Sequence, residues 1–230
     1  MIDWLRNSLF FGAFITIAAY ETGLLIRRRF KLAILNPLLL GVIIVIGLNA
    51  LLGIAYDDYN QGAQYLSYLL TPATVCLAVP LYEQLSLLKK HWKAVVSGIA
   101  ACVLSSLVGV WLLSLLFGLD HTLYVTLLPK SITSAIGMAL AEELGGIAAI
   151  TVPVIIFSGI LGNVFADGIL RLFRITHPIA KGVAIGTGAH AIGTARALEY
   201  GPVEGAMSSL SIAVSGLLTV VAASFFAQLL

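Results

Sequence analysis

The chain has 230 residues, of which 60% are hydrophobic and only 10% are charged, and its mean hydropathy is +1.02. Charged residues at this frequency cannot cover a water-facing surface. The composition therefore excludes an ordinary soluble protein and indicates a membrane protein with several spans. The formal net charge is +2, and no basic stripe with interleaved aromatic residues occurs, which excludes a typical nucleic-acid-binding protein.

Six apolar runs are long enough to cross a bilayer, because a spanning helix needs about 20 apolar residues. They cover residues 8–26, 33–54, 66–86, 94–117, 147–170 and 204–228. Arg6 precedes the first run, but no small-residue cleavage site follows it, so we interpret this run as an uncleaved span.

The third run holds Pro72 and Pro80 and has Glu83 near its end. Proline removes a hydrogen bond from a helix and bends its axis, so we expect this span to be kinked. Together with Asn163 in the fifth run, these residues form a predicted pathway lining. An ordinary kink with a charge at the membrane interface explains the third run equally well.

Most of the cationic residues fall into three clusters. These are Arg27, Arg28, Arg29 and Lys31; Lys89, Lys90 and Lys93; and Arg171, Arg174 and Lys181. The positive-inside rule places all three clusters in the cytoplasm. The same orientation places both chain termini and the acidic loop that contains Asp57 and Asp58 outside the cytoplasm.

Two further segments, residues 122–146 and 183–202, are apolar but carry Gly, Ser, Thr and charged residues. The orientation of the clusters leaves no net crossing for either segment. We therefore expect each to be re-entrant or discontinuous, the first entering from outside and the second from the cytoplasm. In the alternative, both segments cross fully, and the third basic cluster lies outside.

These two segments resemble each other. When residues 134–145 are aligned with residues 190–201, seven of the twelve positions are identical. The small-residue bias of membrane proteins is an alternative explanation for part of this match. Because the two copies would enter from opposite sides, we predict an all-α membrane protein with an inverted repeat, formed by residues 122–170 and 183–228 of a single domain over residues 1–230. Secondary transporters commonly bind their substrates at such repeat interfaces.

Lys130 and Arg196 lie outside the basic clusters, one in each copy. A charged side chain near the middle of a bilayer costs about 2.5–3.5 kcal/mol on insertion scales, so it is normally retained for pairing or for function. The two cations predict a site for a small anion such as a carboxylate. The alternatives are that Lys130 reaches the outer surface and that Arg196 and Glu199 neutralise each other.

Polar residues near the two cations complete the predicted site. The predicted substrate-binding residues are Lys130, Ser131, Thr133, His190, Thr194 and Arg196, and the predicted ion-coupling residues are Glu143 and Glu199. A hydrogen-bonded structural role is the alternative for His190, and structural pairing is the alternative for the two glutamates. The sequence contains no metal-ligand spacing, nucleophile elbow or phosphate-binding loop, so we predict neither an enzyme nor a cofactor.

A set of short motifs extends over nearly the whole chain. They are "NPLL" (36–39), "PLYEQ" (80–84), "LPKSIT" (128–133), "GGI" (145–147), "GTGAHAIGTA" (186–195) and "EGAMSSL" (204–210). In these motifs the chain resembles the LrgB/CidB family. It departs from the family pattern at Ser134 and Ala135, where the family often has Thr-Pro, and at Ala189, where the family has Ser.

The resemblance implies a bacterial inner-membrane protein that acts with a small LrgA/CidA-type membrane partner, is named holin- or antiholin-like, and controls murein hydrolases. It also implies kinship with the plastidal glycolate/glycerate translocator and with pyruvate-transport systems. Two functions follow: a secondary transporter of small monocarboxylates coupled to H⁺ or Na⁺, and a holin-like regulator. The paired segments with one cation each favour the transporter, and we expect a homodimer because two-fold assemblies prevail.

Overall fold

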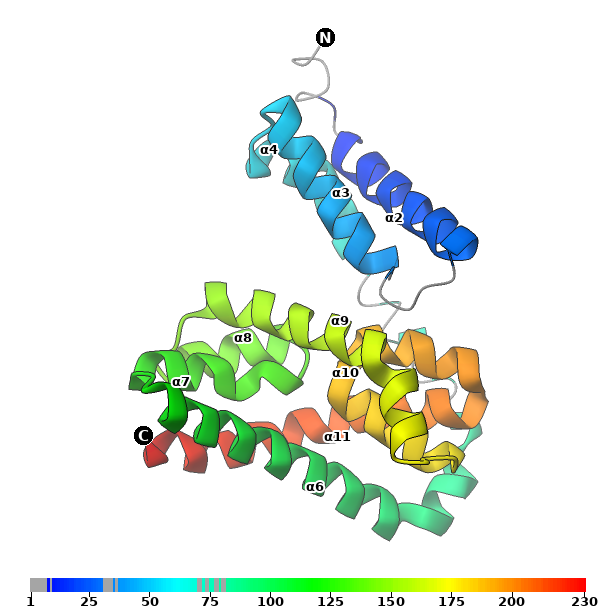
Figure 1. The fold of residues 1–230 in the computed structure, drawn as a ribbon, viewed down its shortest axis with the longest axis vertical. Coiled ribbons are helices and arrows are strands. Elements are labelled where there is room, and N and C mark those ends of the chain that lie inside the picture. The colour runs from blue at the N-terminus through cyan, green and yellow to red at the C-terminus, as the bar shows by residue number, and fades with distance from the viewer. Residues whose placement is uncertain are drawn as a thin grey trace. The chain divides into compact units, whose positions relative to one another are not determined.

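The computed structural model describes residues 8, 10–30, 35, 37–69, 72, 75, 76, 79 and 82–230 (Figure 1). Every regular element among these residues is a helix. The chain divides into two compact units, Met1–Cys76 and Leu77–Leu230, and the single domain expected from the sequence stays a prediction. The second unit contains both of the polar segments and is the one that positions the candidate site.

The first unit contains the helices α2 (Phe11–Phe30), α3 (Pro37–Leu52) and α4 (Tyr56–Ser67). α2 packs against both α3 and α4. Gly12 allows a close approach to α4, because a Cβ at this position would lie only 2.0 Å from the carbonyl oxygen of Tyr59. The hydroxyl groups of Thr16 and Tyr59 are 2.7 Å apart and join the same two helices.

The prediction of an acidic loop around Asp57 and Asp58 is wrong, because both residues lie in the first turn of α4. Carboxylates in this turn stabilise a helix, because they lie near the positive end of its dipole. The buried Gly62 and the contact of Tyr59 with α2 show that one face of this polar segment is packed. The sequence composition was typical of a loop, but the charge placement favours a helix.

Five of the six predicted spans correspond to helices, and the third, at 66–86, is described only in part. The first two predicted spans match α2 and α3, and the last three match α6 (Leu85–Phe117), α9 (Ala148–Leu172) and α11 (Pro202–Phe226). α6, α9 and α11 are long and apolar enough to cross a membrane. α3 is also apolar but has only 16 residues, about 24 Å of helix, which is less than the hydrocarbon core of a bilayer.

α6 begins at Leu85, well before the predicted start at residue 94. The preceding turns carry the lysines of the second basic cluster, and lysine is a good helix former. The apolar run therefore ends before the helix does. The backbone at His91 is non-helical, with φ −116° and ψ 15°, so the charged turns are set off from the apolar part by a kink.

The segment 122–146 is discontinuous, as predicted. It forms α7 (His121–Leu127), the 3-10 helix η1 (Leu128–Ser131) and α8 (Ser134–Glu143). Ile132 and Thr133 are extended and separate η1 from α8. Pro129 within η1 has no backbone N–H to continue an α-helix, which explains why the first half ends here.

The segment 183–202 is also discontinuous. It lies in α10 (Pro178–Tyr200), where His190 has φ 51° and ψ −139° and divides the helix into two halves. In the alignment of the two segments, His190 is paired with Ser134, the first residue of α8. The two breaks therefore occur at equivalent positions, and each broken segment is followed by a helix of 25 residues, α9 or α11.

The three long helices of the second unit alternate in direction (Figure 1). α6 and α11 run from right to left in this view, and α9 runs from left to right. The short helices α7 and α8 lie at the left end of the unit, and α10 lies at the right end. Buried residues on α6 recur every three or four positions (Val95, Ile99, Val103, Leu107 and Val110), which gives this helix one core-facing side.

Candidate functional site

The two broken segments meet inside the second unit, where η1 contacts both α6 and α10. The Lys130 ammonium donates hydrogen bonds to the hydroxyl groups of Ser131 at 3.0 Å and Ser106 at 3.2 Å. The Ser106 hydroxyl in turn donates to that of Ser131 at 2.8 Å. We call Ser106, Lys130, Ser131 and His190 the central break.

Lys130 is half-buried, and both of its hydrogen-bond partners are neutral hydroxyl groups. Among the described residues no carboxylate lies within ion-pair distance of its ammonium group. A positive charge that is removed from water and lacks an acidic partner attracts an anion strongly, because little solvent screens it. The surroundings of Lys130 therefore favour a negatively charged ligand.

His190 is 4% exposed, and neither ring nitrogen has a hydrogen-bond partner among the described residues. The Lys130 ammonium lies within electrostatic range of the imidazole, and the Ser131 backbone lies beside it. Nearly all buried polar groups form hydrogen bonds, so a buried ring whose nitrogens form no hydrogen bond that meets distance and angle limits is a candidate ligand position, with the Ser131 backbone as its nearest polar neighbour.

The backbone of His190 supports the same conclusion. Its positive φ of 51° belongs to a region that glycine occupies readily and other residues rarely do. A residue held in such a region costs on the order of 1–3 kcal/mol, and such residues cluster at functional sites. The break at His190 is therefore strained and carries a buried polar side chain.

α9 passes close to the central break through two glycines. A Cβ at Gly162 would lie 2.8 Å from the carbonyl oxygen of Gly188, and a Cβ at Gly159 would lie 3.7 Å from Nδ1 of His190. Any larger residue at Gly159 would fill space beside the imidazole. Two half-helices, α8 and the second half of α10, begin shortly after the residues of the central break in the chain. Helix N-termini favour negative charge.

The threonines of the predicted site flank the central break. Thr194 is fully buried, donates a hydrogen bond to the His190 carbonyl oxygen at 3.0 Å and lies 2.8 Å from the Ser208 hydroxyl of α11. It therefore holds the break against α11. Thr133 is half-buried and precedes α8 as its N-cap residue, without a side-chain capping hydrogen bond.

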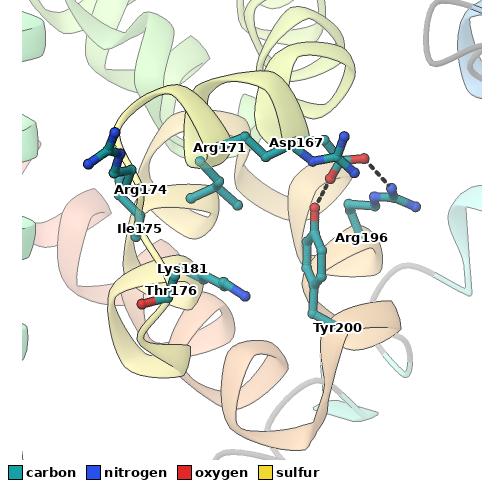
Figure 2. Close-up of a pocket in the computed structure, with 9 residues that line it drawn as sticks. Asp167, Arg171, Arg174, Ile175, Thr176, Lys181, Arg196 and Tyr200 are labelled. Carbon is teal, nitrogen blue, oxygen red and sulfur yellow. Dashed lines mark hydrogen bonds and ion pairs between the residues drawn. The ribbon is translucent and has the colours of Figure 1, made fainter.

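Arg196, unlike Lys130, has carboxylate partners among the described residues. Its guanidinium donates to a carboxylate oxygen of Asp167 at 2.7 Å (Figure 2) and also pairs with Glu199. Tyr200 donates its hydroxyl hydrogen to the other carboxylate oxygen of Asp167. The alternative in which Arg196 and Glu199 neutralise each other is therefore confirmed, and the two cations do not share hydrogen-bond partners.

A pocket of about 630 Å³ opens beside this ion-pair network, where α9 ends and α10 begins and ends (Figure 2). Its lining includes four cationic side chains, Arg171, Arg174, Lys181 and Arg196, and the carboxylate of Asp167. Neither Asp167 nor Tyr200 is among the residues predicted from the sequence. An aspartate inside an otherwise apolar span was the signal that identifies this position.

The remaining predicted residues lie outside both of these places. Glu143 is exposed at the end of α8, and the Asn163 amide nitrogen is 3.5 Å from the Ile192 carbonyl oxygen, at the limit of a hydrogen bond. Pro72 and Glu83 are exposed, and Pro80 lies outside the described residues. Within the part of the chain that the structure describes, no group of His, Cys, Asp and Glu is placed to hold a metal ion.

Comparison with known proteins gives a consistent result. The model of the LrgB-like family matches residues 16–229. The "Antiholin-like protein LrgB" of Bacillus mycoides (strain KBAB4) is 36% identical over 94% of this chain and 95% of its own length, and that of Bacillus cereus (strain B4264) is 35% identical over the same shares. No solved structure matches the chain.

Proposed function

This chain belongs to the LrgB-like family, and from that premise we propose that it is an antiholin-like membrane protein that restrains murein hydrolase activity together with a small LrgA-like membrane partner. The supporting observation is the length of the match, since relatives that carry the antiholin-like name align over nearly the whole of both chains. Their names favour this function over the monocarboxylate transporter predicted from the sequence.

Autolysis measurements test this proposal. In a host bacterium that lacks the chain, we expect faster lysis and stronger murein hydrolase bands on gels that contain cell-wall substrate. Expression of the wild-type chain restores the slow rate only when the LrgA-like partner is present. Equal lysis rates with and without the chain would overturn the proposal.

A second candidate function has a specific geometric observation in its favour. His190 is buried with both ring nitrogens unpartnered, beside a lysine that has no acidic partner among the described residues. A small carboxylate fits these groups, because it accepts charge-assisted hydrogen bonds from an ammonium and from an imidazole N–H. We propose that the central break binds a small monocarboxylate such as pyruvate, glycolate or glycerate.

Transport of that anion requires access to the central break from both sides of the membrane. We propose that the broken segments are re-entrant and enter from opposite sides as an inverted repeat. The equivalent positions of the two breaks and the alternating directions of the long helices support this arrangement (Figure 1). Glu143 and Glu199 occupy equivalent positions in the two copies and remain the predicted coupling residues for H⁺ or Na⁺.

Uptake of labelled pyruvate and glycolate into proteoliposomes tests the transporter. We expect saturable uptake by the wild type and a loss of roughly tenfold or more in Lys130→Met and in His190→Leu, because each variant removes one hydrogen-bond donor to a charged ligand. Lys89→Met removes an exposed cation from α6 and is the matched control. Unsaturable release of large dyes would instead indicate a pore.

The same variants separate the two candidate functions. If His190→Leu folds, loses uptake and also fails to slow autolysis, the central break serves both activities. If the variant loses uptake but still restrains the murein hydrolases, the antiholin-like activity depends on another surface of the protein. Measurement of both activities on one set of variants therefore distinguishes the functions.

A further inference from the structure

The pocket beside Arg196 carries more positive charge than the protein itself neutralises. We call the residues Arg171, Arg174, Lys181, Arg196 and Tyr200 the basic pocket. Arg196 is already paired with Asp167 and Glu199. Arg171 and Arg174 form no ion pair with any described residue, so their charges are free to meet a ligand.

The aromatic ring of Tyr200 holds two of the cations in place. The Lys181 ammonium lies 5.6 Å from the ring centroid, and the Arg196 guanidinium carbon lies 5.4 Å from it. Cations within about 6 Å of a ring face are attracted to it. The hydrogen bond from Tyr200 to Asp167 fixes the ring in turn, so this side of the pocket is built from connected side chains (Figure 2).

Arg174 occupies a backbone position that favours glycine. The chain leaves α9 with the Ile175 N–H bonded to the Leu170 carbonyl oxygen at 2.8 Å, and Arg174 between them has φ 53°. This helix ending usually has glycine at the left-handed position, because a Cβ is disfavoured there. An arginine at this position adds backbone strain, and its side chain lines the pocket.

We propose that the basic pocket binds a phosphate group. Arginine guanidinium groups match phosphate oxygens in pairs, and lysine supplies a point charge to the same kind of ligand. The pocket lies at the ends of helices next to an apolar span, where basic pockets bind anionic lipid headgroups. A phospholipid headgroup and a soluble phosphate compound present the same chemistry, and the experiment distinguishes them.

The test uses the full-length protein purified in a neutral detergent. One arm measures retention of phosphatidylglycerol relative to phosphatidylcholine by native mass spectrometry. The other arm measures the shift in melting temperature with sodium phosphate against sodium chloride at equal ionic strength. Retention of phosphatidylglycerol identifies the lipid as the source, and a shift with inorganic phosphate identifies a soluble ligand. The absence of both effects in the wild type would overturn the proposal.

Two charge-matched double variants show whether the pocket is responsible. We expect Arg171→Gln with Arg174→Gln to weaken the observed binding by roughly tenfold or more, since two phosphate contacts are removed. Lys89→Gln with Lys90→Gln removes the same charge from exposed positions outside the pocket and leaves binding unchanged. An equal loss in both double variants would show only a general attraction between basic residues and anions. That result would overturn the proposal that the basic pocket is the binding site.

Arg174→Gly provides a second variant that retains the fold. Glycine relieves the backbone at φ 53°, so the variant has a melting temperature equal to or above that of the wild type, while its phosphate binding falls. Unchanged binding in this stable variant would contradict a role for Arg174. The proposal does not depend on uptake or autolysis, because the basic pocket shares no residue with the central break.

Discussion

At the scale of single residues, His190 departs most from ordinary structural rules, since it combines a positive φ with a buried and unpartnered ring. The sequence identified it as a candidate because it lies between glycines and threonines. The backbone strain could not be predicted, because φ depends on how α9 and α11 hold both ends of the break. The backbone conformation and burial of His190 are therefore stronger evidence for a ligand than the glycines and threonines around it in the sequence.

Replacement of His190 by glycine and by alanine separates the backbone from the side chain. Both variants lose the imidazole, but glycine tolerates the positive φ and alanine does not. We expect His190→Gly to be more stable than His190→Ala by about 1–2 kcal/mol. Thermal unfolding in detergent measures the difference, and uptake is lost in both variants. Equal melting temperatures would show that the break relaxes when the ring is removed.

Arg196 has an ion-pair partner that the sequence does not reveal. The i,i+3 spacing to Glu199 was visible, whereas Asp167 lies on α9 and approaches only in the folded protein. The guanidinium therefore has two carboxylate partners, where the sequence indicated one. This pairing makes Arg196 a weaker candidate for substrate binding than Lys130, whose partners are hydroxyl groups.

A double-mutant cycle on Asp167→Asn and Arg196→Met measures the pairing. The side chains are 33% and 23% exposed, so solvent screens the pair and we expect a coupling energy of only about 1 kcal/mol. We also expect the double variant to retain saturable uptake, since the pair has a structural role. Loss of uptake in the double variant, with normal folding, would restore Arg196 as a substrate-binding residue.

At the scale of helices, hydrophobic runs predicted the long elements well because burial and membrane insertion both follow apolar composition. Boundaries were less predictable where charged residues continue a helix, as at the start of α6 and throughout α4. The contact between α10 and α11 was partly predictable from glycine content. A Cβ at Gly186 would lie 2.4 Å from the Ser208 carbonyl oxygen, so glycine is required for this approach.

Gly186→Ala tests the helix contact. The added methyl group meets backbone and not a movable side chain, so we expect a loss of about 1–3 kcal/mol in stability, as for other overpacked positions. Gly109→Ala on α6 is the matched control, because nothing lies within 4 Å of its added Cβ. Alanine favours a helix over glycine by about 1 kcal/mol, so the control is as stable as the wild type or more so. Equal effects of the two changes would contradict the close contact.

At the scale of the whole chain, the second unit has two broken segments whose breaks are equivalent in the alignment of residues 134–145 with 190–201, and the inverted repeat itself stays a prediction. The predicted breaks are present, and α9 and α11 have equal lengths. The orientation of the chain in the membrane is predicted from the basic clusters alone. The Tyr124 hydroxyl donates to the Phe226 carbonyl oxygen at 2.8 Å, so α7 and the end of α11 lie at the same end of the unit.

Single cysteines in a variant without Cys76 and Cys102 test the orientation. His121→Cys and Gln228→Cys lie near the two groups that this hydrogen bond joins, so an impermeant thiol reagent should label both from outside intact cells. Thr176→Cys follows α9 and the third basic cluster, so labelling requires permeabilised cells. The reverse pattern, with only Thr176→Cys labelled in intact cells, would invert the topology. Labelling of His121→Cys and Gln228→Cys from opposite sides would contradict the packing of α7 against α11, because one hydrogen bond cannot span a bilayer.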